Sequence, residues 1–150
     1  MKKLYFPFSF LAVFLSVLFT GWNASALNIT DYNITFEIMP DLRVAETISM
    51  NFAEKLNAST LNYVVLGEIS DLVVSDGTKN IDYVLEKSRN EYNVKFFALE
   101  GTEKLVITFT AKDLVFFSES IYSFSANLKP PQAQKVSIKA FLPKGFAIYR

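Results

Sequence analysis

The chain has 150 residues, 51% of them hydrophobic and 20% charged, with five Gly and five Pro, which excludes disordered, collagen-like and low-complexity chains. Its 15 basic and 15 acidic residues cancel, so no net charge attracts nucleic acid or an anionic membrane surface. Cys and His are both absent, which removes disulfides, thiol nucleophiles, imidazole bases and the usual zinc sites.

The first 26 residues have the pattern of a secretory signal peptide. Lys2 and Lys3 precede an apolar run from Leu4 to Thr20, and Ala24-Ser25-Ala26 forms a small-x-small cleavage site. The alternative is an uncleaved signal anchor, because the 17-residue run is at the lower limit of the ~17–25 residues that span a bilayer. The cleavage site favours removal, so we expect a signal peptide at 1–26 and an extracytoplasmic domain at 27–150.

Apolar and polar residues alternate with period two along the rest of the chain, which is typical of strands with one buried face. The first two stretches, from Tyr32 to Ile38 and from Leu42 to Phe52, predict an antiparallel hairpin around Met39-Pro40-Asp41. Residues 111–117 fit either a short helical turn or a bulged corner. Further strands are predicted at 61–66, 69–75, 81–85, 92–98, 105–111, 122–128 and 136–142, with turns at Asp76-Gly77, Ser88-Arg89-Asn90, Glu100-Gly101 and Lys129-Pro130-Pro131.

Short strands with turn signals about every ten residues predict an all-β fold. We expect an antiparallel, immunoglobulin-like β-sandwich of about eight or nine strands. A domain of this length buries enough surface to form a core without disulfides.

Glu46 is the most informative polar residue, because it shares the apolar face of its strand with Val44 and Ile48. An isolated carboxylate there costs several kcal/mol, so it must be paired, protonated or at the end of a sheet. One interpretation is a carboxylate with a perturbed pKa in a site. The favoured interpretation is structural: a local bulge or a buried ion pair, with Arg43, Arg89 or Lys95 as candidate partners.

Carboxylates are the remaining means of acid–base catalysis, and a glycosidase needs two of them across a cleft. The acidic residues lie mainly on polar faces and in turns, where solvation explains them better. The segment Asp76 to Asp82 places oxygen ligands at alternate positions as a calcium loop does, but Ile81 stands at the glycine position and Lys87 at the final glutamate position. We therefore expect a hairpin turn, and neither a metal site nor a cofactor.

Two further features concern the surface. Sequons for N-glycosylation occur at Asn23, within the signal segment, and at three positions of the domain that would be surface acceptors in a cell with the glycosylation machinery: Asn28, Asn33 and Asn57. Large apolar residues on polar registers or in an apolar run form a candidate partner surface if they cluster: Phe97, Phe116 and Phe141. Burial by loops or a neighbouring domain is the equally weighted alternative.

The hairpin pattern Tyr32-x-Ile34-x-Phe36-x-Ile38 followed by Val44-x-Glu46-x-Ile48, with Leu142-Pro143-Lys144-Gly145 late in the chain, resembles a known family. This family is the exported N-terminal β domain of archaeal membrane-anchored regulatory proteins, many of which continue into a transmembrane helix and a cytoplasmic winged-helix module. Leu42 departs from the family, in which a turn Gly is common. The resemblance implies an ectodomain whose natural chain continues beyond Arg150 into a membrane span.

These observations lead us to expect a non-catalytic binding or sensory domain, secreted or anchored to the cell membrane, with a protein or glycan partner at the cell surface. A structural component of the cell envelope, assembled through edge strands and aromatic patches, is the alternative. A carboxylate-based hydrolase is the third possibility.

Overall fold

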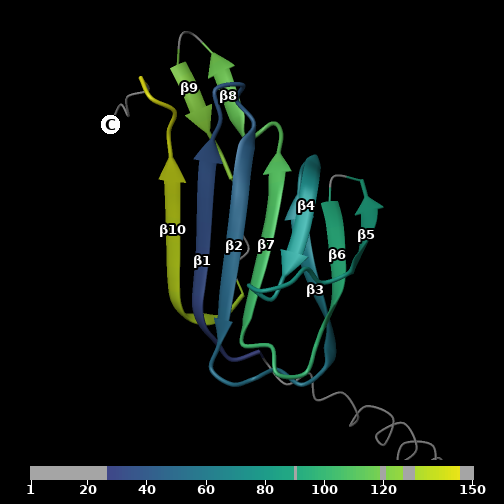
Figure 1. Cartoon of the computed structure of the whole chain (residues 1–150). Helices are drawn as coiled ribbons and strands as arrows, with labels where there is room; N and C mark the ends of the chain where they lie inside the picture. Colours follow the sequence, from purple (N-terminus) through teal and green to yellow (C-terminus); the bar gives the residue numbers. More distant parts are fainter. Residues whose placement is uncertain (1–26, 90, 119–120, 127–130, 146–150) are drawn as a thin grey trace, which may run out of the picture.

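The computed structural model describes residues 27–145 except residues 90, 119–120 and 127–130, and these residues form an all-β sandwich (Figure 1). The signal segment and the predicted turn at Lys129-Pro130 lie outside the described residues. Among the residues described, no helix is long and apolar enough to cross a membrane. The described part of the chain forms ten strands: β1 (Ile29–Ile38), β2 (Val44–Phe52), β3 (Ser59–Leu66), β4 (Ile69–Ser75), β5 (Tyr83–Ser88), β6 (Glu91–Ala98), β7 (Lys104–Ala111), β8 (Val115–Ser118), β9 (Ile121–Phe124) and β10 (Ala133–Phe141).

The strands form two unequal sheets and a small hairpin. Sheet A has five strands in the order β10-β1-β2-β7-β4, and sheet B has three in the order β3-β6-β5. Within the described residues, β8 and β9 pair only with each other. The sequence predicted antiparallel neighbours, and most pairs are antiparallel, but β1 and β10 are parallel. The first and last strands of the sandwich are therefore neighbours in sheet A.

The core lies between the inner faces of the two sheets. Every second side chain is buried along β2, from Tyr32 onward in β1 and up to Phe109 in β7, as the alternation predicts. Sheet B contributes Val65, Val94 and Phe96 to the same cluster. The largest fully buried side chains of sheet A are Ile29, Tyr32, Ile34, Phe36, Val44, Ile48, Val74, Leu105 and Ile107.

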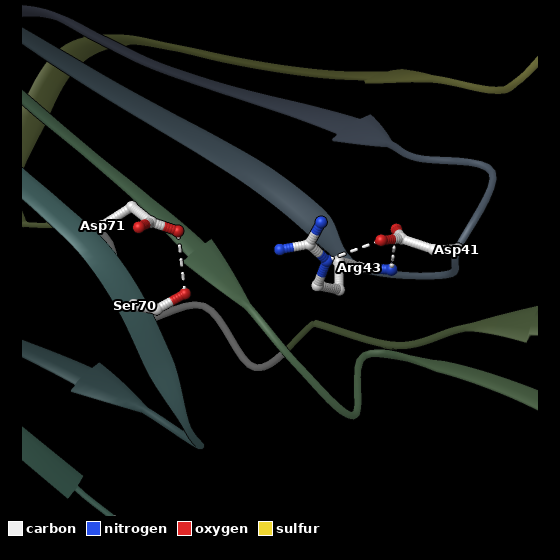
Figure 2. A network of polar contacts seen from close by, with 4 residues as sticks. All are labelled: Asp41, Arg43, Ser70 and Asp71. Atoms are coloured by element: carbon white, nitrogen blue, oxygen red, sulfur yellow. Dashed lines mark hydrogen bonds and ion pairs between the residues drawn. The ribbon is translucent and has the colours of Figure 1, made fainter.

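The turn between β1 and β2 contains Leu42. The alternation of apolar residues predicted Leu42 in the second strand, and this prediction is wrong. The φ of Leu42 is 66°, in the left-handed region that Leu disfavours, and its amide donates a 2.9 Å hydrogen bond to the Met39 carbonyl. Asp41 accepts hydrogen bonds from the Arg43 backbone at 3.3 Å and from the Arg43 guanidinium at 2.7 Å (Figure 2). These contacts hold the turn, so the strand begins at Val44 rather than at Leu42.

Residues 112–114 form the corner between β7 and β8. Asp113 has a φ of 60°, and no helical turn lies in this segment. Of the two alternatives for residues 111–117, the helical one is therefore wrong.

The two edges of sheet A differ. At β4 the pairing with β7 shifts register between Ser70 and Val73, where Asp71 has a φ of 55° and accepts a hydrogen bond from the Ser70 hydroxyl (Figure 2). Such a bulge twists an edge strand away from regular pairing. At the other edge, β10 pairs with β1 without a register shift.

Candidate functional site

The inner face of β10 is open to solvent. In the parallel register, Val136 lies beside Tyr32 and Ile138 beside Ile34, so each pair shares a face of sheet A. Ile34 is 1% exposed, whereas Val136 is 45% and Ile138 is 53% exposed. The cause is the unequal width of the sheets: three-stranded sheet B lies toward β4, at the side of the molecule opposite β10 (Figure 1). Two side chains with a core pattern therefore face water.

The β8–β9 hairpin adds aromatic side chains next to β1, at one end of the sandwich. Phe124 packs edge-to-face on Phe36 of β1, with ring centroids 5.1 Å apart, and this contact anchors the hairpin to sheet A. Phe117 and Tyr122 face each other across the hairpin at 4.7 Å and both remain exposed. In Figure 1 the hairpin stands at the end of the sandwich to which β1 and β10 point. We call the open inner face of β10 and this hairpin the open face.

The three aromatic residues predicted to form a partner surface do not form one patch. All three are exposed. Phe97 is on the outer face of sheet B, paired with Thr60 of β3. Phe141 is on the outer face of sheet A, paired with Glu37, and Phe116 is on the β8–β9 hairpin. Only Phe116 belongs to the open face, since Phe97 and Phe141 lie on the outer sides of two different sheets.

Glu46 lies on the inner face of β2, between Phe36 of β1 and Phe109 of β7, and is 8% exposed. The register is regular there, so the predicted bulge is absent. The predicted ion pair is also wrong: Arg43 pairs with Asp41, Lys95 pairs with Glu86 on sheet B, and no described cation, Arg89 included, pairs with Glu46. Burial raises the pKa of the carboxyl to about 7. Glu46 is therefore protonated in mildly acidic solution.

Two tyrosines link the sheets near this carboxyl. The hydroxyls of Tyr32 on β1 and Tyr63 on β3 share a hydrogen bond of 2.7 Å. Burial raises the pKa of both phenols, and the charge of Glu46 raises both further. Glu46, Tyr32 and Tyr63 form a polar cluster inside the sandwich, with one group that titrates near neutral pH.

The segment from Asp76 to Asp82 is a turn, as predicted. Asp76 accepts hydrogen bonds of 2.9 Å from the backbone N–H groups of Thr78 and Lys79 and one of 2.6 Å from the Thr78 hydroxyl. These bonds lower the pKa of Asp76 to about 2. The Asp76 carboxylate thus accepts its hydrogen bonds from residues of the same turn and stabilises that turn. No group of three or more acidic side chains within the described part of the chain could hold a metal ion.

The three sequon asparagines of the domain lie at different depths. Asn28 and Asn57 are exposed, and Asn28 accepts a 3.3 Å hydrogen bond from the Gln134 side chain. Asn33 is half-buried on the outer face of β1, between Ser49 of β2 and Ser137 of β10. Glycan attachment thus has the freest access at Asn28 and Asn57. Asn23 lies outside the described residues.

No protein-family model matches the chain, and no curated protein matches its sequence. Among solved structures, native yeast LTA4 hydrolase resembles it with a TM-score of 0.38 and 12% identity, covering 61% of this chain and 15% of the hydrolase. The chain thus spans less than a sixth of the hydrolase.

Proposed function

We propose that the chain is a non-catalytic extracytoplasmic binding domain that recognises a protein partner through the open face. The observation that carries this proposal is the exposure of Val136 and Ile138, whose neighbours Tyr32 and Ile34 on the same face are almost completely buried. Exposed apolar side chains that adjoin one another are typical of interaction surfaces in soluble proteins. A partner on this face would complete the inner layer that sheet B leaves unfinished.

Two sequence features support the extracytoplasmic part of the proposal. The signal-peptide pattern at 1–26 directs export. The resemblance to the exported domains of archaeal regulatory proteins makes a sensory role at the membrane surface the more specific form of the proposal.

A structural component of the cell envelope is the second candidate, because β10 is a regular edge strand that could join copies or other envelope proteins. The two functions differ in their partners: a sensory domain binds a limited set of molecules, whereas an envelope component forms extended arrays. Glu46 would be the first residue to test for the third possibility, a carboxylate-based hydrolase.

The test is site-specific photocrosslinking of the full chain in cells that produce it. A photoreactive amino acid replaces Ile138 in one variant and Val64 in the other; Val64 is 50% exposed on the outer face of sheet B and serves as the matched control. We expect protein adducts from position 138 and none from position 64. Adducts of equal yield at both positions, or at neither, would contradict the proposal.

A further inference from the structure

β10 offers a free, regular edge for pairing with another strand. It ends sheet A, and no described strand lies on its side away from β1. Its register with β1 is regular from Asp31 and Lys135 to Glu37 and Phe141. The bulge at Asp71 interrupts the opposite edge of the sheet. Long regular edges readily accept a further strand, so β10 is the edge of sheet A that can be extended.

We propose that β10 pairs antiparallel with β10 of a second copy of this chain, joining two copies of sheet A into one continuous sheet. The inference rests on the proposed function, because it names a partner that joins the molecule at the β10 edge of the open face. A two-fold axis perpendicular to the sheet relates the copies and keeps both inner faces on the same side. In an antiparallel pair, residues directly opposite each other point to the same face, so inner residues meet only inner residues.

Charge disfavours some of the possible registers. Val136 and Ile138 lie on the inner face, and Lys135 and Lys139 lie on the outer face. Pairing centred on Ser137 would set Lys135 directly opposite the partner's Lys139, twice in each dimer, and like charges in that position are destabilising. Pairing centred on Ile138 sets Lys135 opposite the partner's Phe141 and Lys139 opposite the partner's Ser137. No lysine then faces a lysine.

The same register places the apolar side chains in contact. Ile138 lies opposite the partner's Ile138, and Val136 lies opposite the partner's Ala140, all on the inner face. A register centred on Lys139 would again oppose two lysines, and one centred on Val136 would oppose Ile138 and the partner's Gln134. Of the registers centred on residues 136 to 139, the one centred on Ile138 therefore combines the most apolar contact with the least charge repulsion.

A second copy carries a strand that can pair with the free edge of β10. It provides a strand of the same nine residues, with apolar side chains on the inner face and lysines on the outer face. One pair of strands forms an interface smaller than the ~800 Å² per partner of a standard complex. The association should therefore be weak and depend on protein concentration.

Because the chain has no cysteine, single cysteine variants of the full chain report the contact directly. In the proposed register, position 138 faces itself at a Cα separation of about 4.5–5.5 Å, within the range of a disulfide. Position 137 meets its own copy only diagonally, at about 7–8 Å, beyond that range. Ile138→Cys should therefore give a disulfide-linked dimer on mild oxidation, several-fold more than Ser137→Cys and than the exposed control Val64→Cys.

The outcomes separate this inference from the proposed function. Equal linkage by all three variants, linkage by Ser137→Cys alone, or no linkage at high concentration would overturn the pairing of two copies. If linkage fails while photocrosslinking at position 138 captures a different protein, the open face binds a partner but not a second copy. If both experiments fail, both proposals are wrong.

Discussion

Replacing Glu46 with Gln should change how the stability of the sandwich depends on pH. The carboxyl has a pKa of about 7 in the folded protein against 4.5 without burial, because the core disfavours its charged form. Between these pH values the folded state holds a proton that the unfolded state releases, so stability falls as pH rises through this window. The contribution of the protonated Glu46 carboxyl to the free energy of unfolding is fully present below pH 4.5 and is lost by about pH 8.

The size of the effect follows from the same two values. The gap between 4.5 and about 7, at ~1.36 kcal/mol for each pH unit, corresponds to about 3 kcal/mol. Gln has nearly the same shape and no charge at any pH. Glu46→Gln should therefore lack this loss and be more stable than the unchanged protein at pH 8, by up to about 3 kcal/mol less the cost of burying the amide, ~1–2 kcal/mol.

Urea unfolding at pH 5, 6, 7 and 8 measures the effect, with the difference between the two proteins isolating Glu46 from all other titrating groups. Glu54→Gln, at an exposed position, is the matched control and should leave the pH dependence unchanged. Parallel curves for Glu46→Gln and the unchanged protein would refute the reasoning. They would mean that the carboxyl is ionised in the fold and stabilised by a group the structure does not place beside it.

Three further predictions concern the turn, the tyrosine pair and the hairpin. Leu42→Gly should raise the free energy of unfolding by about 0.5–1 kcal/mol in urea, because Gly adopts a φ of 66° without strain, whereas Leu42→Ala should give no gain. Tyr63→Phe and Tyr32→Phe should each lower the free energy of unfolding in urea by about 1 kcal/mol, because each removes the same hydrogen bond. The double variant should therefore lose less than the sum of the two single variants, and additive losses would contradict the pairing of the two hydroxyls. Phe124→Ala should speed amide exchange in β8 and β9 while leaving β2 protected, and equal acceleration in both would show that the hairpin is not anchored locally.

The alternation of side chains predicted most strands of the sandwich but not where the turn at Leu42 ends. Leu42 continues the apolar alternation of Val44, so the pattern alone places it in the strand. Its left-handed backbone is set by the hydrogen bonds of Asp41 and of the Met39 carbonyl. Local contacts of a turn overrode the period-two signal there.

The open face could not be predicted, because it depends on the relative width of two sheets. Val136 and Ile138 follow the same pattern as the buried residues of β1, and the pattern correctly placed them on the inner face. What it lacks is the parallel pairing of β1 with β10, which joins strands about 100 residues apart. That pairing carries β10 beyond the area that sheet B covers.

The inward position of Glu46 was predictable, but the lack of a cation beside it among the described residues was not. Arg43 was one of three candidate partners, and its guanidinium instead donates a hydrogen bond to Asp41, two residues away in the turn. Lys95 points to the outer face of sheet B, where its ammonium donates a hydrogen bond of 2.6 Å to the carboxylate of Glu86 on β5. Whether a cation reaches a buried carboxyl depends on how the sheets pack together, which the pattern of a single strand does not contain.

Cysteine labelling tests most directly whether a partner covers the open face outside the cell. Full-length Ile138→Cys and Val64→Cys variants are treated with a membrane-impermeant maleimide, in intact producing cells and as dilute purified protein. We predict that both label at similar rates when purified, and that in cells position 64 labels while position 138 is protected. Equal labelling of both positions in cells would show that nothing covers β10, and no labelling of position 64 would show that the domain is not exported.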